Sequence, residues 1–152
     1  MDRSKMIDVD VRSRYTGSSI LIAEDDPSNR KVALLILRRL GYQADAVVDG
    51  IEALQALERQ HYDLILMNIG MPRMDGITAA QEIRARFPAA RQPIIIAITA
   101  YLLPDGRDRC LDAGMNDYII KPVTMADLAR TLSKHCPRIQ LASNVIGKSI
   151  DN

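Results

Sequence analysis

The chain has 152 residues, of which 47% are hydrophobic and 26% are charged, as is typical of one soluble globular domain with a buried core. Twenty basic residues against nineteen acidic ones give a net charge of +1, so its charge gives no reason to expect nucleic acid as a partner. No apolar run approaches the ~20 residues that cross a membrane, so we expect no membrane contact. Two distant cysteines without a secretory signal favour a reducing, cytoplasmic compartment.

Three segments of the chain differ in their pattern. Residues 1–17 are polar and charged without sustained periodicity, and we expect them to form a flexible N-terminal leader. Residues 18–137 alternate apolar runs with helical patterns, which predicts one folded domain. Residues 138–152 have weak helical and strand character, and we expect a C-terminal tail or the start of a linker.

Short apolar runs alternate with helical patterns throughout the expected domain. The predicted strands are residues 19–23, 42–48, 63–67, 94–98 and 117–120. A helix is expected after each strand, and the residues suited to cap these helices are Asp26, Asp49, Asp75 and Thr124. The strand after residue 63 is apolar on both faces, as in a parallel sheet covered by helices. Five strands alternating with five helices predict a doubly wound α/β sheet.

Four predicted strands end on polar side chains. Glu24 and Asp25 follow the first strand, Asn68 the third, Thr99 the fourth and Lys121 the fifth. Because parallel strands end on the same edge of a sheet, we expect these side chains to meet. Two carboxylates with a third oxygen suit Mg²⁺, and a hydroxyl with an ammonium suits a phosphoryl group. Each residue alone is commonplace in a loop, so the prediction depends on their joint placement.

Two segments carry a family resemblance. Residues 71–76 read Met-Pro-Arg-Met-Asp-Gly, and residues 113–122 read Ala-Gly-Met-Asn-Asp-Tyr-Ile-Ile-Lys-Pro. With the strand ends, they resemble the receiver domains of response regulators, over roughly residues 19–136. The resemblance implies a flavodoxin-like five-stranded parallel sheet in the order 2-1-3-4-5 with five helices. It also implies a phosphoacceptor module of two-component or phosphorelay signalling, which is not an enzyme beyond self-catalysed phosphoryl transfer.

The resemblance assigns a magnesium site. Asp25 would bind Mg²⁺ directly, Glu24 largely through water, and the backbone carbonyl of Gly70 would supply a further ligand. Asn68 matches the position at which receiver domains carry their phosphoacceptor aspartate. Because an amide oxygen is a weaker magnesium ligand than a carboxylate, we expect Asn68 to weaken Mg²⁺ binding.

The resemblance also implies partners and a switch. Thr99 and Lys121 would contact the phosphoryl oxygens, and Tyr118 matches the aromatic residue that turns inward as the threonine moves. The donor would be a histidine kinase or a histidine phosphotransfer protein, and the output would pass through the face of residues 104–134. The segment at residues 113–122 is closest to receivers of hybrid sensor histidine kinases, so we expect either a stand-alone receiver or one excised from such a kinase.

An amide at position 68 leaves two interpretations open. It lacks the anionic oxygen that attacks phosphorus, so the chain as written is expected to stay unphosphorylated. Asn68 is either an Asp-to-Asn change in a working receiver or part of a natural pseudo-receiver that signals by binding alone. Retention of both acids, Thr99 and Lys121 favours the first interpretation.

Two other classes of function fit the sequence less well. An aspartate-dependent phosphohydrolase needs an acid two residues after its nucleophile, and that position is Gly70. A flavin carrier needs a phosphate-binding loop rich in serine, threonine and glycine after its first strand. The chain has the acidic residues Glu24 to Asp26 there, which repel phosphate unless a metal lies between them.

Overall fold

A computed structural model describes residues 19–100 and 104–136 of the chain. The expected leader, residues 1–17, and the expected tail, residues 138–152, lie outside these ranges. Within the two ranges no helix combines the length and the hydropathy that a membrane crossing requires.

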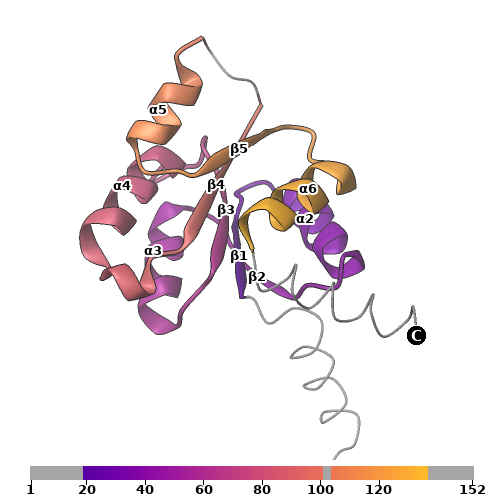
Figure 1. The fold of residues 1–152 in the computed structure, drawn as a ribbon, viewed down its shortest axis with the longest axis horizontal. Coiled ribbons are helices and arrows are strands. Elements are labelled where there is room, and N and C mark those ends of the chain that lie inside the picture. The colour runs from indigo at the N-terminus through magenta and orange to yellow at the C-terminus, as the bar shows by residue number, and fades with distance from the viewer. Residues whose placement is uncertain (1–18, 101–103, 137–152) are drawn as a thin grey trace, which may run out of the picture.

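Five parallel strands form one sheet in the spatial order β2-β1-β3-β4-β5 (Figure 1). The strands are β1 (Ile20–Ala23), β2 (Ala44–Val47), β3 (Leu64–Asn68), β4 (Ile94–Thr99) and β5 (Asp117–Ile120). This confirms the predicted sheet and its order. Strand β3 lies at the centre between β1 and β4, and all five of its residues are buried. Its last residue is Asn68, which therefore stands at the middle of the carboxyl edge.

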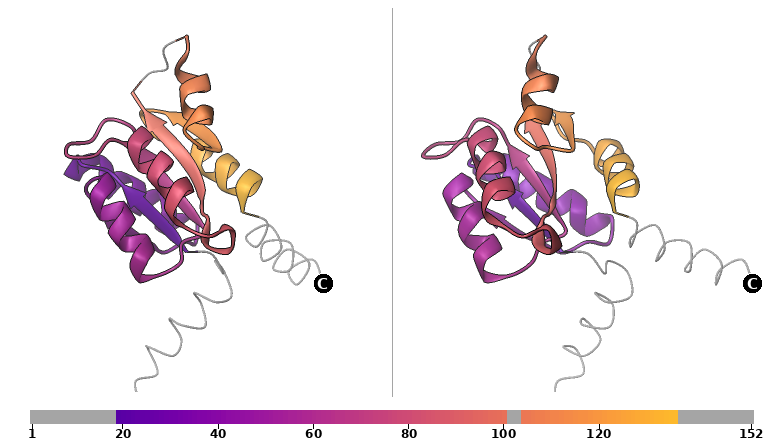
Figure 2. Two further views of the ribbon diagram at one scale, coloured as in Figure 1. Left: turned by 90° about the vertical axis from the view of Figure 1, so that its left-hand side faces the viewer. Right: turned by 60° about the vertical axis from the view of Figure 1, so that its left-hand side comes forward.

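The five predicted helices are present, and they cover both faces of the sheet. They are α2 (Pro27–Arg39), α3 (Gly50–Arg59), α4 (Gly76–Arg86), α5 (Gly106–Asp112) and α6 (Met125–His135), with a 3₁₀ turn η1 (Ala89–Arg91) in the loop before β4. Figures 1 and 2 show α3 and α4 on one side of the sheet and α2 and α6 on the other. The predicted α/β fold, with a sheet covered by helices on both faces, is therefore confirmed.

Strand residues alternate between the two helical layers. In β1, Leu21 packs with the core under α3 and α4, whereas Ile22 packs with the core under α2 and α6. In β3, Ile65 and Leu66 divide in the same way. Because successive side chains of a strand point to opposite faces, a strand that is apolar at every position needs cover on both sides. The doubly covered sheet therefore follows from the composition of its strands.

The start of β2 differs from the prediction. The sequence predicts a strand over residues 42–48, but β2 spans Ala44–Val47. Gly41 has a φ of 94°, and the Tyr42 N–H donates to the carbonyl of Leu37 over 2.9 Å. This is a helix-terminating arrangement in which a left-handed glycine turns the chain back onto the last turn. Tyr42 therefore closes α2 instead of opening the strand.

Side-chain caps begin four of the helices, α2, α3, α4 and α6. The capping side chains accept hydrogen bonds from backbone N–H groups in the pairs Asp26–Asn29, Asp49–Glu52, Asp75–Thr78 and Thr124–Asp127. All four predicted caps are confirmed. Because each cap fixes where its helix begins, it also sets the length of the loop between the strand end and that helix.

Candidate functional site

A cavity of about 430 Å³ lies at the carboxyl edge of the sheet. Six predicted site residues line it: Glu24, Asp25, Asn68, Gly70, Thr99 and Lys121. The seventh, Tyr118, does not line this cavity. It is half-buried against the core on the α3 and α4 side, and it lines a separate cavity of about 80 Å³ with Asp117 and Lys134.

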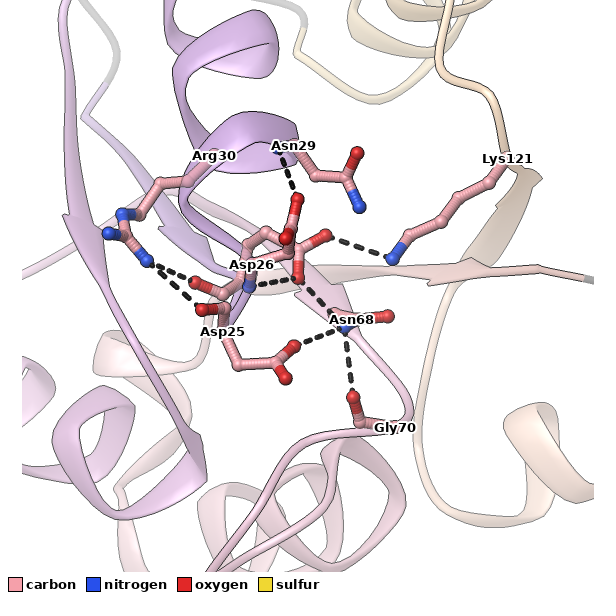
Figure 3. A network of polar contacts seen from close by, with 8 residues as sticks. Asp25, Asp26, Asn29, Arg30, Asn68, Gly70 and Lys121 are labelled. Carbon is pink, nitrogen blue, oxygen red and sulfur yellow. Dashed lines mark hydrogen bonds and ion pairs between the residues drawn. The ribbon is translucent and has the colours of Figure 1, made fainter.

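The carboxamide of Asn68 is the centre of the polar network (Figure 3). Its Nδ2 donates to Glu24 Oε2 over 2.9 Å, to Asp25 Oδ1 over 3.0 Å and to the carbonyl oxygen of Gly70 over 3.0 Å. An amide nitrogen carries two hydrogens, so three acceptors share two donors. The residue is only 5% exposed. Two carboxylates and one carbonyl therefore converge on a single, weakly positive nitrogen.

Lys121 supplies the full positive charge beside this nitrogen. Its Nζ lies 2.9 Å from Glu24 Oε1, while Glu24 Oε2 also accepts from the backbone N–H of Asp26 over 3.1 Å. Glu24 is 5% exposed, so its charge is compensated almost entirely by protein groups. The Lys121 N–H donates to the Thr99 carbonyl over 2.7 Å, which ties the ends of β5 and β4 together.

Arg30 fixes the backbone of the acidic loop from the first turns of α2. Its Nη1 donates to the Glu24 carbonyl over 2.9 Å and lies 3.5 Å from the Asp25 carbonyl (Figure 3). Sequence reasoning missed this residue. An arginine six positions after the first acid carries no signal by itself, because its direction depends on the angle at which α2 leaves the loop.

The far wall of the cavity comes from α4 and α5. Ile77, Arg109 and Cys110 line it, and the sequence analysis named none of them. Burial raises the pKa of the Cys110 thiol, with the nearby Arg109 charge acting weakly in the opposite direction. Since the thiolate is the reactive form of cysteine, this residue contributes apolar surface instead of a nucleophile.

The oxygen atoms around Asn68 have the character of a hard-cation site. Two carboxylates and a backbone carbonyl are ligands that Mg²⁺ takes together with water. In the part of the chain that the structure describes, no group of three or more histidine, cysteine, aspartate or glutamate side chains is placed to hold a metal. The third side chain at this point is an amide, and its nitrogen faces the oxygens.

Comparison with known proteins identifies the family. The response regulator receiver domain matches residues 20–133, which is most of the chain. The chain belongs to this family. Receiver domains are signalling modules of two-component and phosphorelay systems, so this receiver domain is such a module, and the family resemblance read from the sequence is confirmed.

Similar receiver domains occur within hybrid sensor histidine kinases. This receiver is 44% identical over 124 residues to Histidine protein kinase 1 of Candida albicans, covering 76% of the chain but 5% of that protein. It is 36% identical over 121 residues to the sensor histidine kinase RcsC of Escherichia coli, covering 80% of the chain and 12% of that protein. The chain thus spans only a small part of the length of these relatives.

Two solved structures of receiver domains are similar to this chain. The receiver domain of the sensor histidine kinase PA1611 from Pseudomonas aeruginosa, with a magnesium ion in its active-site cleft, is 47% identical with a TM-score of 0.70, covering 78% of this chain and 96% of that one. The complex of the Saccharomyces cerevisiae phosphotransfer protein Ypd1 with the Ssk1 receiver contains a chain that is 27% identical. Its TM-score is 0.71, with 78% of this chain and 88% of that one covered.

Replacing Asn68 by aspartate is expected to destabilise the metal-free protein by about 1–3 kcal/mol, because it exchanges a shared hydrogen-bond donor for a third carboxylate. Urea unfolding in the presence of a chelator measures this difference. Gln55→Glu is the matched control, since it adds one negative charge at an exposed position of α3. Equal stability of the Asn68→Asp variant and the control would mean that the amide does not hold the two acids together.

Proposed function

We propose that this receiver domain is held unphosphorylated because Asn68 stands where the family carries its phosphoacceptor aspartate. The observation that supports the proposal is the position of its Nδ2, within 3.0 Å of oxygens from Glu24, Asp25 and Gly70. A carboxylate can attack phosphorus with an anionic oxygen, whereas a carboxamide has no such nucleophile. The signalling state of the chain as written is then the unphosphorylated one.

The proposed cation site consists of Glu24, Asp25 and the carbonyl of Gly70. Their chemistry fits Mg²⁺, which would neutralise the charge of a phosphoryl group in the cavity. In this chain the Asn68 nitrogen lies at the point where the three oxygens converge, so it takes up acceptors that the ion would need. We therefore expect weaker Mg²⁺ binding than in a receiver with aspartate at this position.

The other proposed roles belong to residues at or near the ends of β4 and β5. Lys121 and Thr99 are proposed to contact the phosphoryl oxygens, because both line the cavity that holds Asn68. Tyr118 is proposed as the switch residue. It pairs in register with Ala97 on β4, two positions before Thr99, so we expect a shift at the end of β4 to reach Tyr118 through the paired strands. The output face is proposed to comprise residues 104–134.

Two origins of Asn68 make different predictions for the aspartate variant. In a working receiver silenced by one substitution, the rest of the phosphoryl site must still be assembled. The 2.9 Å contact between Lys121 and Glu24, and the cavity shared with Thr99, support this origin. In a natural pseudo-receiver, restoring the carboxylate would not restore the reaction.

Intact-mass measurement after incubation with Mg²⁺ and acetyl phosphate tests the proposal. The phosphoryl group should pass to the carboxylate of the Asn68→Asp variant, with release of acetate, and the unaltered chain should gain nothing. Failure of both proteins to react would favour the pseudo-receiver. A phosphoryl group on the unaltered chain would contradict the placement of the acceptor at position 68.

The α2 side of the site offers a surface for the phosphoryl donor. Val32 and Leu35 are 50% and 53% exposed, although both are large apolar residues. Val32 also lines a second cavity of about 420 Å³, which reaches Asn68 and Lys121. We propose that a histidine phosphotransfer domain docks here, because a donor histidine must approach residue 68 and this apolar surface is continuous with that position. The similarity to the receiver fold crystallised with Ypd1 supports this choice.

Val32→Asp and Leu35→Asp, each combined with Asn68→Asp, are expected to slow phosphoryl transfer from a phosphorylated phosphotransfer protein by about tenfold or more. A charge would replace an apolar side chain whose burial contributes about 1.5–3 kcal/mol. Phosphorylation by acetyl phosphate should not change. The control Leu111→Asp alters an equally exposed residue on α5 and should affect neither reaction. Equal slowing by all three substitutions would contradict docking on α2.

A further inference from the structure

The loop that follows β3 is attached to the beginning of α3 by an ion pair. Arg73 Nε donates to Asp49 Oδ2 over 2.6 Å, and its Nη2 contacts the same carboxylate oxygen. A weaker contact of 3.7 Å joins Nη2 to Glu52 Oε2. Asp49 is 1% exposed, whereas the Arg73 side chain is 57% exposed. A surface arginine therefore reaches inward to a buried carboxylate.

The charge of Asp49 persists in this buried position. Burial raises its pKa, but hydrogen bonds from the Glu52 N–H and the Arg73 guanidinium, with the charge of Arg73, leave the pKa below its ordinary value. Asp49 also caps α3 through its other oxygen, which accepts from the Glu52 N–H over 2.9 Å. The anchor is thus part of the rigid start of a helix and stays ionised at neutral pH.

The backbone of the loop indicates that this attachment is specific. Arg73 has a φ of 64°, a left-handed conformation that residues with a Cβ seldom adopt. The next residue, Met74, accepts a hydrogen bond from the Gly50 N–H over 3.1 Å, and a Cβ on Gly50 would lie 2.8 Å from that carbonyl oxygen. The loop is therefore pressed against the N-terminus of α3, where only glycine leaves room for it.

The same loop begins with the carbonyl that completes the oxygen cluster. Gly70 accepts from Asn68 Nδ2 over 3.0 Å, and after the loop the Gly76 N–H donates to the Ile69 carbonyl over 2.8 Å. Both ends of the loop are thus held near β3, and Arg73 holds its middle. Gly70 itself has no side chain with which to fix its carbonyl. We therefore expect the direction of that carbonyl to depend on the backbone conformation of the whole loop.

We propose that Arg73, anchored by Asp49, is a positioning residue that sets the Gly70 carbonyl for the cation site. The inference rests on the proposed function insofar as that carbonyl is a cation ligand. Arg73 does not line the cavity and would act only through the loop. Groups behind a metal ligand commonly change metal affinity when they are removed, because they orient the ligand.

The test is the Mg²⁺ affinity of Asn68→Asp, measured by calorimetry with and without Arg73→Gln. Loss of positioning should weaken binding by about tenfold to a hundredfold. Electrostatics alone predicts the opposite sign, because removing a positive charge and exposing Asp49 makes the surroundings of the cation more negative. The sign of the change therefore separates positioning from charge. Unchanged or tighter binding would overturn the proposal.

Two further variants make this test specific. Arg86→Gln removes the same charge from α4, where Arg86 pairs with Glu82 on an exposed surface, and it should not weaken Mg²⁺ binding. Arg73→Lys keeps the charge but loses the planar guanidinium, so it should also weaken binding. If Arg73→Gln does not fold, Arg73→Lys decides the proposal by the same criterion.

A metal-free readout separates this inference from the proposed function. In the unaltered chain, NMR measures hydrogen exchange of the Asn68 side-chain amide, which donates to Gly70. Arg73→Gln should speed this exchange relative to Arg86→Gln, and equal rates would overturn the positioning role. If Asn68→Asp binds no Mg²⁺ at all, the proposed function fails, and the exchange measurement alone decides the role of Arg73.

Discussion

Concentrated negative charge at the carboxyl edge of the sheet is the constraint on which this site depends. Glu24 and Asp25 follow one strand directly, and the carbonyl of Gly70 faces them from the next loop. Glu24 is buried, so its charge requires compensating partners. In this chain the Asn68 nitrogen donates a hydrogen bond to Glu24, and the Lys121 ammonium forms an ion pair with it. The amide therefore links the two acids through its nitrogen, at the position that we propose to be that of the acceptor.

The fold produces this cluster through ordinary packing. Apolar strands need helices on both faces, so the connections are crossovers and every strand ends on the same edge. Capping side chains then fix where the helices begin, which sets the length of the edge loops. At the start of α4 a Cβ on Gly76 would collide with the Asn68 carbonyl oxygen, so the helix packs tightly against the end of β3. Residue 68 thus has little room to move.

The sequence predicts the doubly wound sheet, the helix caps and the meeting of six site residues, because these follow from periodicity, capping patterns and the common edge of parallel strands, whereas the strand order follows from the family resemblance. Other features depend on loop conformation, which a local pattern does not determine. The left-handed backbone of Arg73 and the direction of Arg30 belong to this group. So does the orientation of the Asn68 amide, which follows from the acceptors that surround it. Tyr118 lies beside the core and outside the cavity, a placement that strand alternation alone did not specify.

We propose that the Asn68 amide takes the place of a cation among the oxygens of Glu24, Asp25 and Gly70. The most direct measurement is a Mg²⁺ titration of the unaltered chain and of Asn68→Asp, followed by the backbone amide NMR signals of Glu24, Asp25 and Gly70. These signals should shift in Asn68→Asp and stay in place in the unaltered chain at the same Mg²⁺ concentrations. Equal shifts in both proteins, with the same midpoint, would contradict this proposal.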